Sequence, residues 1–130
     1  MTDSRKTLIW VGQSRKELAE FPPDVRRAMG FALHLAQIGQ KHEKAKPLRG
    51  FGGAGVLEVV EDDDGSTFRA VYTVKFSDAV YVLDAFQKKS VRGIKTAAVD
   101  INRIKARLKD AQEIHHERQR KKEQQEQGRP

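Results

Sequence analysis

The segment Thr67-Phe-Arg-Ala-Val-Tyr-Thr-Val-Lys-Phe76 alternates between two sets of side chains along its whole length. Such a period of two predicts a β-strand whose successive side chains point to opposite faces of a sheet. Phe68 and Tyr72 belong to the set that we expect to face a core, whereas Arg69 and Lys75 belong to the other set. We therefore expect this other set to form an open face of the sheet that carries positive charge.

A second strand-like run, Ala79-Val-Tyr-Val-Leu-Asp-Ala-Phe-Gln-Lys-Lys-Ser90, follows after the short turn Ser77-Asp78. This run is apolar on both faces, a pattern that is typical of a central strand. It ends in Lys88 and Lys89, which would bring two more cations close to Arg69. A surface of this kind suits a polyanion, most simply the backbone of a nucleic acid.

The remaining elements follow from apolar periodicity and from turn residues. Asp64-Gly65 is the expected centre of a hairpin turn, and Ser14 with Glu17 is the expected capping box of the first helix. We expect strands at residues 7–11 and 56–61, and helices at 15–20, at 24–37 and from Thr96 onward. This order predicts an α+β domain. Its antiparallel sheet would have about four strands, with two N-terminal helices on one face, a C-terminal helix, and the other face partly open.

The length of 130 residues fits one domain, which we place at residues 1–115. Residues 116–130 are dominated by charged and polar side chains and have little to bury, so they should form a frayed or disordered tail. No apolar run approaches the roughly 18 residues that span a bilayer. The N-terminal residues lack the apolar centre of a secretory signal, and the chain has no cysteine. We therefore expect a cytoplasmic protein with no membrane partner.

Positive charge is concentrated in one part of the chain. The net charge is +7, and residues 85–109 hold eight lysines and arginines against the single acid Asp100. A solvated basic helix would explain part of this run, but its position after a strand end favours an anionic partner. The cations expected to contact a nucleic acid are Arg49, Lys75, Arg92, Lys95, Arg103, Lys105 and Arg107. For Arg69 a purely structural ion pair with Glu58 stays open as the alternative.

Several motifs do not support the chemistry that they superficially resemble. The glycine-rich segment Gly50-Phe-Gly-Gly-Ala-Gly55 does not lie between a strand and a helix, as a dinucleotide site requires. The segment Asp62-Asp-Asp-Gly65 lacks the alternating acids of a calcium loop. The four histidines lack metal-ligand spacing, and no serine-hydrolase elbow is present. We therefore expect neither a metal ion nor a cofactor.

Four segments carry a resemblance to a known family. They are Lys46-Pro-Leu-Arg-Gly-Phe51, Phe68-Arg-Ala-Val-Tyr72, Tyr81-Val-Leu-Asp-Ala-Phe-Gln-Lys-Lys-Ser90 and Gly93-Ile-Lys-Thr96. Together they resemble the phage-derived, HigB-type branch of the RelE/ParE toxin superfamily, over about residues 5–110. The most specific part is the Phe-Gln-Lys-Lys-Ser stretch followed by Lys-Thr and a last helix.

The resemblance implies a RelE-like fold and the toxin of a type II toxin–antitoxin system. It implies a metal-independent endoribonuclease that enters the ribosomal A site and cuts mRNA there. The antitoxin would be a small helix-turn-helix protein. The functional arginine of the family corresponds to Arg69, and its basic residues after the next strand correspond to Lys88 and Lys89. Two alternatives stay open: a ParE-like inhibitor of DNA gyrase, or a toxin-fold binding module or phage accessory protein without catalysis.

Overall fold

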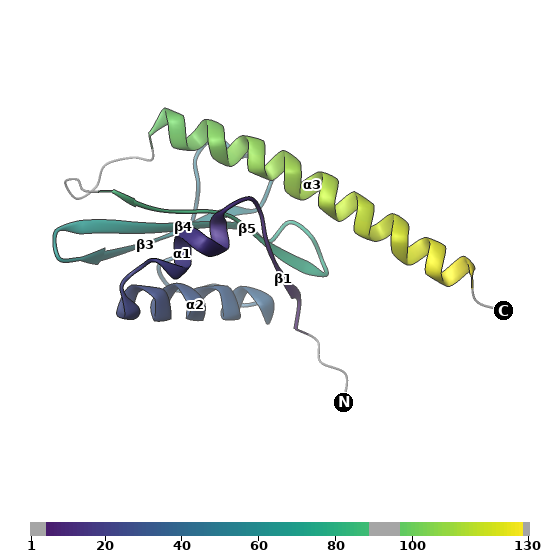
Figure 1. Ribbon diagram of the computed structural model, residues 1–130, viewed down its shortest axis with the longest axis horizontal. Helices are drawn as coiled ribbons and strands as arrows, with labels where there is room; N and C mark the ends of the chain where they lie inside the picture. The colour runs from purple at the N-terminus through teal and green to yellow at the C-terminus, as the bar shows by residue number, and fades with distance from the viewer. Residues whose placement is uncertain (1–4, 89–96, 129–130) are drawn as a thin grey trace.

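The computed structural model describes residues 5–88 and 97–128, which form one five-stranded sheet and three helices (Figure 1). The predicted site residues Lys89, Arg92 and Lys95, and the predicted helix cap Thr96, lie outside these ranges. The strands are β1 (Thr7–Trp10), β2 (Lys46–Pro47), β3 (Val56–Asp63), β4 (Ser66–Thr73) and β5 (Ala79–Lys88). The helices are α1 (Ser14–Ala19), α2 (Pro23–Gln37) and α3 (Ala98–Gln127).

The sheet is built around an antiparallel meander of β3, β4 and β5, as the sequence predicted. Its strand order is β1-β5-β4-β3-β2, which makes β5 an interior strand. One pairing departs from the antiparallel prediction, because the short β1 runs parallel to β5, with Thr7 opposite Ala79. The helices α1 and α2 lie between these two strands in the chain, which gives the connection the length that a parallel crossover needs.

The predicted hairpin turn is confirmed. Asp63 and Ser66 pair across it, and Asp64 and Gly65 have φ values of 47° and 78°. Two successive residues with positive φ are typical of a type I′ turn, whose twist matches that of the flanking strands. The end predicted for α2 is confirmed too, since the helix stops at Gln37 and Gly39 follows with φ of 80°.

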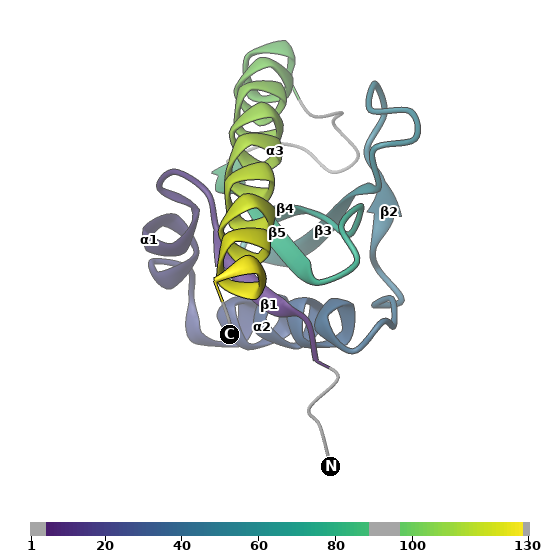
Figure 2. The same ribbon diagram turned by 90° about the vertical axis from the view of Figure 1, so that its right-hand side faces the viewer.

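Two apolar clusters lie on opposite faces of the sheet, and Figure 2 shows α2 and α3 on these two sides. The α2 side contains Met29, Leu33, Val59, Ala70, Tyr72, Val80 and Val82. The α3 side contains Val71, Tyr81, Leu83, Ile104 and Ala111. The side chains of β5 alternate between the two clusters, which explains why this strand is apolar on both faces.

The prediction of a partly open sheet face was wrong. Val71 and Thr73 of β4 are both 0% exposed, and Arg69 is 5% exposed. The physical reason is that two parts of the chain pack on this face. α3 buries the apolar seam of Ile104 and Ala111 over β5. The segment with Phe51 and Ala54 also packs on this face, where the carbonyl of Ala54 accepts from Thr73. The periodicity of the helix predicted the seam, but it did not show which surface the seam would cover.

The capping box predicted for α1 was also wrong. The N-cap of α1 is Gln13 and makes no side-chain hydrogen bond, whereas Ser14 lies inside the helix. The buried Ser14 hydroxyl donates instead to the carbonyl of Val82 on β5, at 3.0 Å. Glu17 points toward α3, where it contacts Arg107. Both side chains therefore join α1 to the rest of the molecule rather than to its own first turn.

The last helix continues past residue 115, where we placed the end of the domain. α3 continues through Gln127 and extends past the sheet (Figure 1). Arg118 and Lys122 both lie within 4 Å of Asp78 in the β4–β5 turn, so the helix contacts the body beyond residue 115. Residues 121–128 are exposed. No helix in the described part of the chain is long and apolar enough to cross a lipid bilayer.

A matched pair of glycine substitutions tests the hairpin turn. Gly65→Ala places a Cβ on a residue with positive φ, and we expect a loss of about 1 kcal/mol in the free energy of unfolding. Gly30→Ala lies in the exposed interior of α2 with nothing within 4 Å of the new Cβ, and it should gain about 0.5–1 kcal/mol. Urea unfolding measures both. A Gly65→Ala protein as stable as the wild type would contradict the turn assignment.

Candidate functional site

Arg69 lies in the middle of β4 on the sheet face that α3 covers. Its Nη1 is 3.1 Å from Oε2 of Glu58 on β3. The two residues are diagonal neighbours, because Arg69 is opposite Val60 and Glu58 is opposite Val71. Both side chains are largely buried, at 7% and 15% exposure. The ion pair that the sequence left open as an alternative is thus present, and it holds the guanidinium in place on the sheet.

Lys88 ends β5 on the same face as Arg69. The register places Lys88 opposite Thr67 and Arg69 opposite Phe86. Because side chains two residues apart share a face, the two cations lie one diagonal step apart, at about 7–8 Å between their Cα atoms. The Nζ of Lys88 is 3.0 Å from a carboxylate oxygen of Asp100 at the start of α3. Lys88 and Arg69 therefore share one sheet face, but each contacts its own carboxylate, Arg69 that of Glu58 on β3 and Lys88 that of Asp100 on α3.

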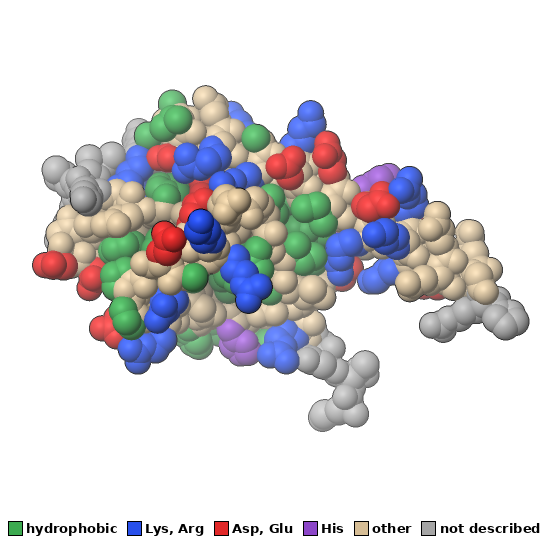
Figure 3. Space-filling model, in the orientation of Figure 1, with side chains coloured by type: hydrophobic (Ala, Val, Ile, Leu, Met, Phe, Trp, Pro, Cys, Tyr) green, Lys and Arg blue, Asp and Glu red, His purple; other side chains and the backbone are tan. Residues whose placement is uncertain are grey.

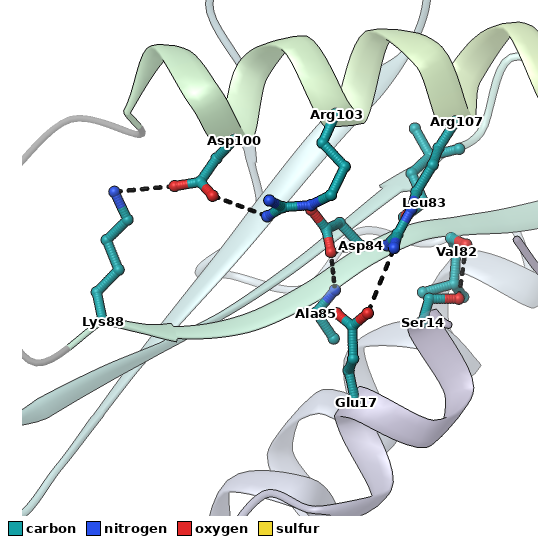
Figure 4. A network of polar contacts seen from close by, with 10 residues as sticks. All are labelled: Ser14, Glu17, Val82, Leu83, Asp84, Ala85, Lys88, Asp100, Arg103 and Arg107. Carbon is teal, nitrogen blue, oxygen red and sulfur yellow. Dashed lines mark hydrogen bonds and ion pairs between the residues drawn. The ribbon is translucent and has the colours of Figure 1, made fainter. Parts of the chain in front are cut away.

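A chain of alternating charges continues from Lys88 across the face of α3 that meets the sheet (Figure 4). Asp100 also accepts from Nη2 of Arg103 at 2.7 Å, and Arg103 Nε donates to Asp84 at 2.8 Å. Asp84 accepts from Nη1 of Arg107 at 2.8 Å. Arg107 then reaches Glu17 of α1 at 3.3 Å. Six side chains from β5, α3 and α1 thus form one connected network.

Asp84 is the centre of this network and is 0% exposed. A carboxylate buried in a central strand is costly unless charged donors surround it. Arg103 and Arg107 are four residues apart and therefore project from one face of α3, and the backbone N–H of Ala85 donates to the same carboxylate at 3.0 Å. Arg107 also donates to the carbonyl of Leu83 at 3.0 Å. These contacts join α3 to β5 at a fixed position.

The network shifts the pKa of several of its members. Burial alone would raise the pKa of Asp100, but hydrogen bonds from Lys88 and Arg103 outweigh it and hold that pKa below its usual value. Burial lowers the pKa of Arg103, but the hydrogen bonds to Asp100 and Asp84 outweigh burial and raise it. Glu17 differs, because burial raises its pKa and Arg107 compensates only partly.

A second contact holds α3 farther along, at the β4–β5 turn. Asp78 lies 3.2 Å from Lys122 and 3.6 Å from Nδ1 of His115. The ring of His115 stacks on Phe76 with 4.1 Å between centroids, and its Nδ1 is 3.3 Å from the hydroxyl of Tyr81. Burial raises the pKa of Asp78, but the hydrogen bond from Lys122 and the neighbouring positive charges lower it below its usual value. α3 is thus attached by charge at both ends of its contact with the sheet.

The cations predicted to contact RNA fall into different groups. Arg49, Lys75 and Lys105 are exposed, whereas Arg103 and Arg107 make internal ion pairs. The face drawn in Figure 3 shows basic and acidic side chains interspersed along α3 rather than one continuous basic patch. Contact of these cations with RNA stays a prediction.

Sequence reasoning missed the role of Asp84, Arg103 and Arg107. The signal in the sequence that could have found it was Asp84 itself, a single acid within an otherwise apolar strand.

The glycine-rich segment is packed against the sheet rather than extended from it. Phe51 is buried in the cluster on the α3 side. Thr73 donates from Oγ1 to the carbonyl of Ala54 at 2.8 Å, and the backbone N–H of Val74 donates to the carbonyl of Gly55. The segment leads into β3 and not into a helix, so it lacks the geometry of a dinucleotide site. In the ranges described, no three histidine, aspartate or glutamate side chains converge as metal ligands would.

A comparison with known protein families gives a match over most of the chain. Residues 16–109 match the sequence profile of the family described as phage derived protein Gp49-like (DUF891). The chain belongs to this family. The match begins within α1 and spans α2, the whole β3–β5 meander and the ion-pair network from Glu17 to Arg107. No curated protein sequence matches the chain.

One solved structure shows that this Gp49-like chain has the RelE-like fold. The free state of an Escherichia coli toxin RelE double arginine-to-alanine mutant is similar, with a TM-score of 0.52 and 17% identity over 82% of this chain and 97% of that one. The toxin–antitoxin complex RelBE2 from Mycobacterium tuberculosis also matches, with a TM-score of 0.41 and 18% identity over 68% of this chain and 98% of that one. The RelE-like fold that the resemblance implied is confirmed, and the matched family is likewise described as phage derived.

The lowered pKa of Asp78 predicts how the stability of this Gp49-like protein depends on pH. A carboxyl group whose pKa is lower in the folded state than in the unfolded chain, where it is about 3.9, stabilises the fold above that value. Its contribution is lost as the pH falls through the folded-state pKa. We therefore expect the difference in unfolding free energy between wild type and Asp78→Asn to be full near pH 5 and to shrink toward pH 3.

Urea unfolding at fixed pH values between 3 and 5 measures this difference. Asp24→Asn is the matched control, because Asp24 makes only an exposed ion pair with Arg27 on α2. The control should follow the wild type closely across the range. A difference for Asp78→Asn that stays constant or grows as the pH falls would contradict the assigned contacts.

Proposed function

We propose that this Gp49-like protein is the toxin of a type II toxin–antitoxin system and acts as a ribosome-dependent endoribonuclease that cleaves mRNA. Membership of a phage-derived family and the RelE-like fold support the toxin role. The observation that carries the proposed chemistry is the placement of Arg69 and Lys88 on neighbouring strands of one sheet face. Two cations fixed on a rigid sheet suit the binding of a phosphodiester.

Cleavage of RNA can proceed without a metal ion when the 2′-hydroxyl attacks the adjacent phosphate. The 2′-oxygen then bonds to phosphorus while the 5′-oxygen of the next nucleotide leaves. The protein must orient the chain and stabilise the charge that develops on the phosphate. Arg69, which is largely buried beside Glu58, would have to exchange that carboxylate for the phosphate, and Lys88 or Lys89 would neutralise the phosphate or protonate the leaving oxygen. The sequence assigns no general base; Glu58, 3.1 Å from Arg69, is the candidate that we propose for the 2′-hydroxyl proton.

A second candidate function rests on the same ion pairs. Arg69 and Lys88 each contact a carboxylate of this chain, Glu58 and Asp100 respectively. A purely structural use of both cations would leave a toxin-fold protein without cleavage chemistry. That protein would be a ParE-like inhibitor of DNA gyrase or a binding module. The two candidates differ in whether new mRNA ends appear when the protein is produced.

The proposed partners follow from the proposed activity. They are mRNA in the ribosomal A site and a cognate antitoxin, in the cytoplasm. The RelBE2 structure is described as a toxin–antitoxin complex, and the partner proposed here is a small helix-turn-helix protein. The exposed cations Arg49, Lys75 and Lys105 are the described side chains that we assign to contacts with RNA.

The substitution Arg69→Lys tests the function without removing the buried charge. Lysine keeps the positive charge beside Glu58, but it lacks the planar fork that binds a phosphate through two hydrogen bonds. We expect a folded protein whose rate of mRNA cleavage falls by about 10²-fold or more. Primer extension on cellular mRNA after induction measures the new 5′ ends, and thermal unfolding confirms the fold.

The matched control is Arg27→Lys, which alters an exposed arginine that is also ion-paired. It should keep wild-type growth inhibition. A folded Arg69→Lys protein that cuts mRNA at the wild-type rate would remove Arg69 from the proposed site. Growth arrest by the wild type with gyrase-dependent DNA breaks and no new mRNA ends would instead establish the second candidate.

A further inference from the structure

Asp100 occupies a position between the predicted site and the body of α3. It lies in the first turn of the helix and is 8% exposed. One carboxylate oxygen is 3.0 Å from Nζ of Lys88, and the other accepts from Nη2 of Arg103 at 2.7 Å (Figure 4). A carboxylate in the first turn is also favoured by the helix dipole. Three separate interactions therefore fix this single side chain.

Arg103 is in turn held from two other directions. Its Nε donates to the fully buried Asp84 at 2.8 Å, and its guanidinium carbon lies 5.5 Å from the ring centroid of Phe86. Phe86 is directly opposite Arg69 on β4. Arg103, which holds Asp100, therefore contacts the part of the sheet around Phe86 that also carries Arg69 and Lys88, the two predicted phosphate ligands.

We infer that Asp100 is a positioning residue for Lys88, a role that rests on the function proposed above. A lysine side chain is a flexible stem with a point charge, and it must be ordered before it can act on a phosphate. Asp100 removes that freedom before RNA binds and holds Nζ on the Arg69 side of the sheet. A charge placed in advance needs no reorganisation when negative charge develops on the substrate.

The inference predicts a particular change in kinetics for Asp100→Asn. The rate at saturating ribosome-bound mRNA should fall by about 10–100-fold, since misplacing a catalytic group costs rates of this order. The concentration that gives half-saturation should not rise, because the variant removes a negative charge near a polyanion. Single-turnover cleavage measures both quantities. Asp100→Glu, which keeps the carboxylate, should restore at least part of the rate.

The matched control is Asp78→Asn, the same substitution at a carboxylate that contacts α3 far from Lys88. It should leave the rate at saturation close to that of the wild type at neutral pH. If both variants lose stability equally and only Asp100→Asn loses rate, the loss does not arise from looser attachment of α3. An equal loss of rate in both variants would overturn the positioning role.

A direct measurement of Lys88 does not depend on cleavage. The ¹H–¹⁵N signal of an ammonium group is visible in NMR spectra when an ion pair slows its exchange with water. We expect a Lys88 signal in the wild type, assigned by its absence in Lys88→Ala, and its loss or broadening in Asp100→Asn. A signal unchanged by that substitution would overturn the inference, as would unchanged or faster cleavage.

Lys88→Ala separates this inference from the proposed function. If Lys88→Ala cuts mRNA as fast as the wild type, Lys88 is not part of the site, and the assignment of that residue fails together with the role of Asp100. If Lys88→Ala is inactive while Asp100→Asn is fully active, the proposed function stands and the positioning role alone is overturned.

Discussion

The burial of one carboxylate determines how the last helix lies on the sheet. Asp84 is fully enclosed in an interior strand, and an enclosed carboxylate without partners would cost several kcal/mol. Arg103 and Arg107 both meet it at 2.8 Å. Because both arginines belong to α3, the charge of Asp84 is matched only when α3 crosses this face. The apolar seam of α3 supplies burial, and the ion pairs supply the position along the sheet.

This requirement divides the positive charge of the chain into two parts. Arg103, Arg107 and Lys88 are used inside the molecule, in contacts with acids of β5, α1 and α3 itself. Lys105, two residues from each of these arginines on α3, is exposed to solvent. A basic segment in a sequence can therefore serve as the attachment of a helix and as a surface for an anionic partner at once. The proposed site includes Lys88 at the end of β5, a cation that makes an internal ion pair with Asp100 and that we also propose to act on the substrate.

The sequence predicted the elements of the fold better than their contacts. Strand alternation and turn chemistry gave the meander with the Asp64–Gly65 turn, and the apolar seam of α3 was recognised as well. The face that this seam covers was not predicted, since periodicity shows which side chains are buried but not what buries them. For the site, the Arg69–Glu58 pair followed from strand neighbours. The role of Asp84 did not, because it depends on a helix that begins fourteen residues later in the chain.

A double-mutant cycle between Asp84 and Arg107 tests most directly whether this ion pair attaches α3 to the sheet. Urea unfolding of wild type, Asp84→Asn, Arg107→Gln and the double variant gives the coupling free energy of the two side chains. The account predicts a favourable coupling of about 0.5–3 kcal/mol, the range found for residues that share a charge network. Changes that add within about 0.5 kcal/mol would show that the two residues act independently, and would contradict it.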